Sequence, residues 1–224
     1  MKDTTSAKID YLIERYPALN VCRQSLTQAV EAIIESYRQG GKLIVCGNGG
    51  SASDSEHIVG ELMKGFVKKR PVTDELYAKM QAVCPNEADY LRDNLQMPLP
   101  AISLMNAVAL NSAFANDQAP DLAMAQQVLG LARPEDIFIG ISTSGNSANV
   151  IYAIQMAKTL GTKTIGLIGN RHCRMQNLCD IVIAAPEMET YKIQELHLPI
   201  YHYICAQVEK YFFSWIHKEI KKKW

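Results

Sequence analysis

The chain has 224 residues, enough for one domain with a substantial core and too many for a mini-protein held together by disulfides. It contains 23 Lys and Arg and 23 Asp and Glu, so its formal charge is zero, which argues against a nucleic-acid partner. Hydrophobic residues make up 48% and charged residues 21% of the chain, as in folded globular proteins and unlike disordered ones.

Cysteine spacing and hydropathy bear on the compartment. The six cysteines include no CxxC pair, and charged residues stand near the start of the chain where a signal peptide needs an apolar run. We therefore expect a cytoplasmic protein. Two uncharged stretches, 94–116 and 137–157, are broken up by prolines or by Ser, Thr, Gly and Asn, so we expect no membrane span.

The first half of the chain predicts a helix followed by a buried strand. Apolar residues recur at helical spacing over 25–37, and the pair Gly40 and Gly41 ends that pattern. The apolar run 43–46 is typical of a strand covered on both faces. A glycine-rich loop, 47–51, follows, and a second helix is expected to begin near Ala52.

The second half repeats the order of strand, small polar loop and helix. We expect strands over 137–141, 164–168 and 181–184, and a helix over 148–160. The run 101–104 is expected to add a strand, giving a five-stranded, mostly parallel sheet in a three-layer α/β sandwich.

The remaining segments are expected to be helical. We predict one domain over 1–224, with a helical region at 1–40 and a charged, helix-forming insertion at 72–97. Pro85 and Asn86 mark a turn or a helix start in the middle of that insertion. From Lys192 the pattern predicts one long helix through Phe213 and beyond, or two helices broken at Pro199. Its apolar residues lie on two sides, which predicts packing against another copy of the chain. The lysines 221–223 suit a helix C-terminus.

Both strand-to-helix loops are candidate anion sites, because the first amides of a helix lack partners and its dipole favours negative charge. The loop 142–147 adds four hydroxyls to such amides, from Ser142, Thr143, Ser144 and Ser147. The alternative is that these residues are helix caps, but a cap needs only one hydroxyl. The first loop also fits the GxGxxA form of a dinucleotide site, yet the region 63–70 that follows is basic and lacks the acidic residue that such a site needs.

Histidines and carboxylates form two further clusters. His57 and Glu61 lie four residues apart and therefore on one face of the helix after the glycine-rich loop. They suit a shared metal or proton path, or else a surface ion pair. The second cluster consists of Gln194, Glu195, His197 and His202. Such ligands suit zinc, although no compact HExxH signature is present.

These motifs together resemble the phosphoheptose isomerases, enzymes with a sugar isomerase (SIS) domain that act on sedoheptulose 7-phosphate. The resemblance rests on CGNGGSA at 46–52, His57 with Glu61, GISTSGNSANV at 140–150 and IQELHLPIYH at 193–202. It implies a five-stranded parallel sheet and a homotetramer whose active sites form between subunits. It also implies conversion of sedoheptulose 7-phosphate to glycero-manno-heptose 7-phosphate through an enediol, with no nucleotide cofactor.

The resemblance assigns roles to particular residues. Glu61 would be the base and His202 the acid. Zinc would be held by His57, Glu61, Gln194 and His202. The sugar phosphate would be bound by Asn48, Gly49, Ser51, Asp117, Ser142, Thr143, Ser144, Ser147 and Gln194.

Helix geometry and several sequence differences from the phosphoheptose isomerases complicate the transfer of these roles to this chain. Gln194 and His202 are about 12 Å apart along a straight helix. We therefore expect that Gln194 lies at or before the helix start, that Pro199 bends the helix, or that more than one subunit contributes to the site, with His197 as the first substitute ligand to consider. The heptose enzymes have a basic residue at the position of Gly65 and an aspartate at that of Tyr191. The insertion at 72–97 is a candidate lid or assembly element.

A non-enzymatic function is the alternative. Sugar-phosphate-binding regulators and partner-binding SIS proteins share the loop motifs, so those loops alone predict only binding. The pairs His57 with Glu61 and Gln194 with His202 are what favour an enzyme.

Overall fold

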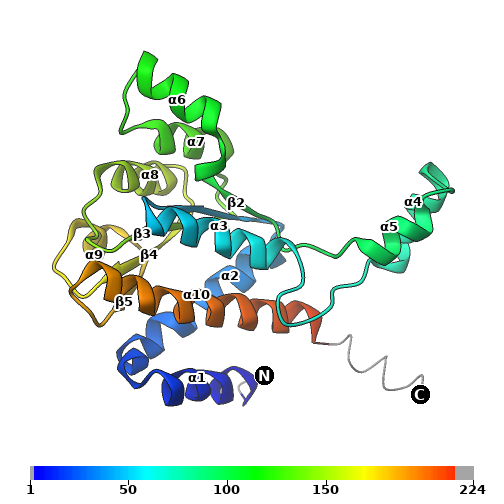
Figure 1. The fold of residues 1–224 in the computed structure, drawn as a ribbon, viewed down its shortest axis with the longest axis horizontal. Coiled ribbons are helices and arrows are strands. Elements are labelled where there is room, and N and C mark those ends of the chain that lie inside the picture. Colours follow the sequence, from blue (N-terminus) through cyan, green and yellow to red (C-terminus); the bar gives the residue numbers. More distant parts are fainter. Residues whose placement is uncertain (1–2, 215–224) are drawn as a thin grey trace.

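The computed structural model describes residues 3–214, a three-layer α/β arrangement around one parallel sheet (Figure 1). The strands are β1 (Leu43–Cys46), β2 (Ala101–Ser103), β3 (Ile137–Ser142), β4 (Lys163–Gly169) and β5 (Ile181–Ala185). Their order is β2-β1-β3-β4-β5 and every neighbouring pair is parallel. The predicted five-stranded parallel sheet is confirmed.

Helices cover both faces of the sheet. On one face lie α1 (Asp3–Arg15), the short 3-10 helix η1 (Pro17–Cys22), α2 (Arg23–Arg38), α3 (Gly50–Met63) and α10 (Thr190–Phe213). On the other lie α7 (Ala123–Leu131), α8 (Ala148–Thr159) and α9 (Arg174–Leu178). β1 supplies both layers, since Leu43 and Val45 pack on the first face and Ile44 and Cys46 on the second. This burial explains why β1 has no polar alternation.

The C-terminal segment forms one helix rather than two. α10 runs without a break through Pro199, whose side chain is buried inside it. Its described part ends at Phe213, and the lysines 221–223 lie outside the described residues. Within the described range, no helix has the length and apolar character needed to cross a membrane.

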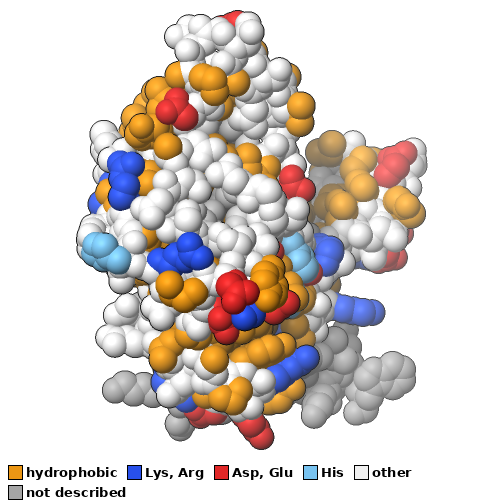
Figure 2. All heavy atoms as spheres, turned by 60° about the vertical axis from the view of Figure 1, so that its left-hand side comes forward, with side chains coloured by type: hydrophobic (Ala, Val, Ile, Leu, Met, Phe, Trp, Pro, Cys, Tyr) orange, Lys and Arg blue, Asp and Glu red, His pale blue; other side chains and the backbone are white. Residues whose placement is uncertain are grey.

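The segment 72–97 forms a projecting hairpin of helices α4 (Asp74–Val83) and α5 (Ala88–Asn94). Figure 1 shows this hairpin projecting from the body on two extended connecting segments. These segments are joined by an isolated antiparallel β-bridge between Pro71 and Gln96. No residue of α4 is buried, and Figure 2 shows hydrophobic and acidic side chains together on the hairpin surface. The helices are as expected, while a role as lid or assembly element stays a prediction.

Four helical segments in the described part of the chain were not anticipated from the sequence, and α7 and α9 are two of them. After β2 come η2 (Leu104–Asn106) and α6 (Val108–Asp117), and α6 packs on α7 at the far end of the molecule in Figure 1. Every residue of α6 is at least partly exposed.

Candidate active site

Two loops meet at the carboxyl edge of the sheet, between β1 and β3. The chain leaves β1 toward β2 on one side and later returns to β3 on the other, so the strand order reverses here. Ligands of open parallel sheets bind at such a switch point. The side-chain amides of Asn48 and Asn149 clamp the loops together, each donating to the other at 2.9 Å. Asn149 was not among the predicted site residues, because its partner lies 101 residues away.

The hydroxyls of loop 142–147 face one another instead of capping the following helix. Ser142 Oγ lies 3.0 Å from Ser147 Oγ and 3.4 Å from Ser144 Oγ. Ser147 is the N-cap residue of α8, yet its side chain makes no capping hydrogen bond. The simple capping interpretation therefore fails for Ser147, and the clustered hydroxyls remain suited to an anion.

Glycines give both loops their tight shape. Gly49 and Gly145 have φ values of +55° and +63°, a region that other residues rarely adopt. A Cβ on Gly145 would also collide with the Cys173 side chain. Ser51, in the first turn of α3, is buried beneath the first loop.

The helices α3 and α10 lie side by side, both with their N-termini toward the loops (Figure 1). They bring His57, Glu61 and His202 together, with one ligand atom from each residue lying within 4.8 Å of the other two. His57 Nε2 is 3.1 Å from Glu61 Oε1 and 3.5 Å from His202 Nε2. The three groups converge within a single chain, so bringing them together needs no second subunit.

The cluster has the chemistry of a cation site. Two imidazoles and one carboxylate match the three protein ligands of catalytic zinc sites, which leave a position for water or substrate. Burial, and secondarily the neighbouring His57, lowers the pKa of His202, which favours the neutral, ligating form. The second oxygen of Glu61 faces the Lys64 ammonium at 3.2 Å.

Gln194 lies at the other end of this helix pair. Its side-chain amide sits against Gly50, where a Cβ would collide with it, at the first residue of α3. His57 is seven residues further along α3, about 10 Å away along the axis. Gln194 is the fifth residue of an unbroken α10, so the expectation that it lies at or before the helix start is wrong, as is the alternative of two helices broken at Pro199, while a bend at Pro199 stays a prediction. Its placement beside the loops fits substrate binding, and its role as zinc ligand stays a prediction.

His197 is not a substitute ligand. Its side chain is fully buried beneath the loops, where Nε2 lies 3.3 Å from the Ile168 carbonyl oxygen. It does not belong to the cluster of His57, Glu61 and His202. The suggestion made from its position in the sequence is therefore wrong, because His197 faces the sheet while His202 faces α3.

Buried His197 is expected to make stability fall in mild acid. Burial lowers its pKa from 6.5 to about 4. Below pH 6.5 His197 binds a proton in the unfolded chain but stays neutral in the folded protein. The free energy of unfolding therefore falls between about pH 6.5 and pH 4, by ~3 kcal/mol. Urea unfolding at pH 7, 5.5 and 4.5 measures this, and His197→Gln is expected to flatten the acid slope. An unchanged slope in the variant would disprove the assignment.

A buried ion pair fastens the loop after α3 to α10. The Glu209 carboxylate accepts from the backbone amides of Phe66, Val67 and Lys68 and from Arg70 Nε at 2.9 Å. Arg70 also donates to the carbonyl oxygens of residues 61 and 62, at the end of α3. The Phe66 ring thereby rests on His202, with 5.3 Å between ring centroids. This pair could not be predicted from the sequence, since lone charged residues are usually exposed.

The departure at Gly65 is linked to the projecting hairpin. Gly65 N donates to Oε1 of Gln96 at 2.8 Å, and a Cβ on Gly65 would collide with that oxygen and with the Lys68 carbonyl. No side chain fits here while Gln96 closes the hairpin base. Asp117, another predicted sugar contact, lies exposed at the end of α6 with Asn116 donating to it, and its role stays a prediction.

Comparisons with known proteins agree with this architecture. Residues 19–94 and 94–169 match the family model described as SIS domain, which spans both loops and α3. A phosphoheptose isomerase of Crocosphaera subtropica is 39% identical over 193 residues, 86% of this chain and 85% of the relative. One from a Nitratiruptor species is 38% identical over 179 residues, 80% of this chain and 82% of the relative. The solved phosphoheptose isomerase from Francisella tularensis has a TM-score of 0.72 at 28% identity, covering 93% of this chain and 97% of that one.

Proposed function

The chain belongs to the SIS-domain family of phosphoheptose isomerases, and from this premise we propose that it interconverts sedoheptulose 7-phosphate and glycero-manno-heptose 7-phosphate. That it is a phosphosugar isomerase rests on its relatives. The observation that carries the finer proposal is the convergence of Glu61, His57 and His202 partway along a helix pair whose N-terminal end meets two phosphate-type loops.

The loops bind and orient the substrate. The phosphate lies among the hydroxyls of Ser142, Thr143, Ser144 and Ser147, with Ser51 and the amides of Asn48 and Gly49 on the facing loop. Gln194, beside the start of α3, contacts the sugar chain. Anchoring one end of an extended sugar fixes which carbons reach the cluster about 10 Å further along α3.

Two side chains of the cluster move the protons. Glu61 removes a proton from C1 of the open-chain ketose, and its carboxyl group, after exchanging that proton with solvent, delivers a proton to C2 of the enediol. His202 carries a proton between the oxygens on C1 and C2, because an imidazole both accepts and donates near neutral pH. No electrons enter or leave the sugar overall, so a nucleotide cofactor has no part in the reaction.

The donor set of His57, Glu61 and His202 fits zinc, with Gln194 as a proposed fourth ligand. A bound zinc ion would polarise the two sugar oxygens as a Lewis acid. A ligating carboxylate is less basic, so the two roles of Glu61 compete. Its two oxygens face different neighbours, Oε1 toward His57 and Oε2 toward Lys64, which divides these roles between them.

We also propose the homotetramer of the family, with a neighbouring subunit completing the active site. A groove of about 640 Å³ opens beside His202, and its lining comes from α1, the loop after α3 and α10. Exposed Tyr11 and Leu198 lie in that lining, as expected of a face covered on assembly. The free cysteines fit a reducing cytoplasm.

The substrate assignment is tested by a panel of phosphosugars. Zinc-loaded protein is expected to convert a ketose and aldose pair of heptose 7-phosphates, followed by NMR, and to leave the unphosphorylated sugars unchanged. Ala substitution of Glu61 and His202 should abolish conversion while thermal stabilisation by the sugar phosphate remains. Conversion of no heptose phosphate, or conversion only of a shorter phosphosugar, would refute the assignment.

A further inference from the structure

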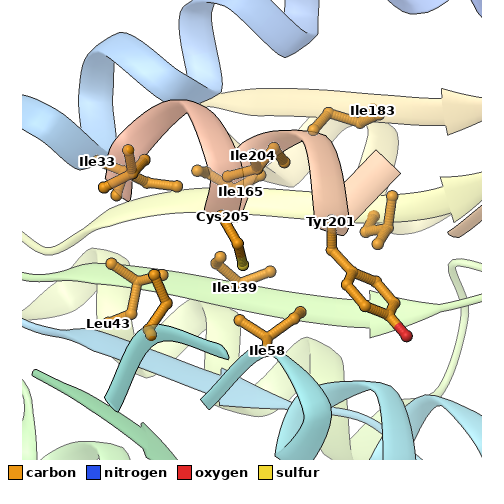
Figure 3. A pocket seen from close by; sticks show the side chains of 12 residues that line it. Ile33, Leu43, Ile58, Ile139, Ile165, Ile183, Tyr201, Ile204 and Cys205 are labelled. Atoms are coloured by element: carbon orange, nitrogen blue, oxygen red, sulfur yellow. The ribbon is translucent and has the colours of Figure 1, made fainter. Parts of the chain in front are cut away.

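Tyr201 joins the apolar core to the cation cluster. Its buried ring lines a cavity of about 20 Å³ between α10, α3 and the sheet, together with aliphatic side chains and Cys205. Figure 3 shows the ring entering from α10 and its hydroxyl pointing away from Ile139 and Ile165. The ring is thus fixed by packing, while the hydroxyl emerges next to α3.

The hydroxyl has two partners on α3 and one proton to share between them. It lies 3.2 Å from Asp54 Oδ1 and 3.0 Å from His57 Nδ1. An ionised carboxylate only accepts, so the Tyr201 proton goes to Asp54. The oxygen of Tyr201 is then left to accept the Nδ1 proton of His57. The other carboxylate oxygen, Asp54 Oδ2, is buried without a partner among the described residues.

These hydrogen bonds determine which nitrogen of His57 carries the proton and which one presents a lone pair to the cluster. With Nδ1 protonated, neutral His57 presents an unprotonated Nε2 toward Glu61 Oε1 and His202 Nε2, at 3.1 and 3.5 Å. A lone pair directed at a carboxylate is repulsive unless a cation lies between them. The hydrogen bond at one nitrogen of a histidine therefore prepares the other for metal binding.

We propose that Tyr201 is a positioning residue that, together with Asp54, holds His57 as the Nδ1–H tautomer and directs its Nε2 into the cation site. This inference rests on the proposed function for the identity of the cation. The hydrogen-bond chain from Asp54 through Tyr201 to His57 is formed by residues of this chain alone.

The chain offers a matched control on the same helix. Tyr203 is also buried, two residues further on, and its hydroxyl has no hydrogen-bond partner among the described residues. Tyr201→Phe removes a hydroxyl that bonds to His57, and Tyr203→Phe removes one that does not. Both changes keep the aromatic ring, so thermal unfolding should verify that both variants fold.

The state of His57 Nδ1 is read by ¹⁵N NMR of histidine-labelled, zinc-loaded protein, with His57→Ala identifying the resonance. Wild type and Tyr203→Phe should show protonated Nδ1 and unprotonated Nε2 at His57. Tyr201→Phe should lose the hydrogen bond at Nδ1, seen as a shifted Nδ1 resonance and faster exchange of the Nδ1 proton. An Nε2–H tautomer in wild type, or an unchanged spectrum in Tyr201→Phe, would overturn the proposal whether or not the protein is an isomerase.

Zinc affinity gives the second readout. Titration against a competing chelator should show Tyr201→Phe binding zinc about 10- to 100-fold more weakly than wild type, since loss of such a supporting group has this effect in other zinc sites. Tyr203→Phe should bind as wild type does, and saturating zinc should restore most of the kcat of Tyr201→Phe. Equal zinc affinity in the two variants contradicts the positioning role, whereas tight zinc binding by wild type without turnover contradicts only the proposed function.

Discussion

Replacing Glu61 with glutamine is expected to lower kcat by about 10²- to 10⁴-fold, the usual contribution of a positioned general base. Glutamine keeps the size of the side chain but neither accepts the C1 proton nor ligates a metal as well as a carboxylate does. The phosphate loops lie at the other end of α3 and are untouched, so KM should change far less than kcat. Steady-state kinetics on the zinc-loaded protein measures both.

Glu56 provides the control for this prediction, since it is an exposed carboxylate on the same helix. Glu56→Gln should leave kcat within about twofold, as expected for a surface change away from any special feature. If Glu61→Gln and Glu56→Gln had similar kcat values, Glu61 would not be the base. Zinc titration of Glu61→Gln separates loss of the metal from loss of basicity.

Replacing Glu209 with alanine is expected to lower the free energy of unfolding by about 3–5 kcal/mol, as found when one member of a buried ion pair is removed. The Arg70 side chain is fully buried, so its guanidinium would be left uncompensated. Three backbone amides would also lose their acceptor. Urea unfolding at neutral pH measures the change.

An exposed ion pair provides the control for this change in the free energy of unfolding. Glu75 and Lys79 form an ion pair on the exposed side of α4, and Glu75→Ala should cost less than about 1 kcal/mol. The double change of Arg70→Met with Glu209→Leu should be more stable than Glu209→Ala alone, because no buried charge remains. A loss in Glu209→Ala no larger than that in Glu75→Ala would mean that water solvates Arg70.

The sheet could be predicted from sequence because its signals are local. The expected strand 43–46 coincides with β1. The strands β2, β3 and β5 differ from expectation by one residue at the C-terminal end, and β4 by one residue at each end. Continuous apolar runs ending in glycine and serine loops mark buried parallel strands wherever they occur. Helix α3 begins at Gly50 rather than near Ala52, since the glycines themselves enter its first turn.

The parts of the site that sequence reasoning missed depend on distant partners. Asn149, Tyr201 and Glu209 each act through a residue on another element. Tyr201 in particular belongs to the apolar pattern of α10, where a tyrosine is expected simply to pack. Only the side-by-side placement of α3 and α10 gives its hydroxyl a function.

His197 and His202 also show that sequence alone does not tell which neighbour a helix residue contacts. The two histidines are five residues apart on α10, and composition alone makes them equivalent ligands. The helix turns one toward Ile168 in the core and the other toward His57 at the cluster. Sequence spacing predicts which residues share a helix face, but not which face meets which neighbour.

The most direct test of the account follows deuterium during turnover. Zinc-loaded protein is incubated with sedoheptulose 7-phosphate in D₂O, and the sugar is analysed by NMR. We predict an aldose product with deuterium at C2, and rates of product formation and exchange about 10²- to 10⁴-fold lower with Glu61→Gln. Binding of the sugar phosphate by the wild-type protein, with neither conversion nor deuterium at C1 or C2, would contradict the isomerase account and leave only a sugar-phosphate binder.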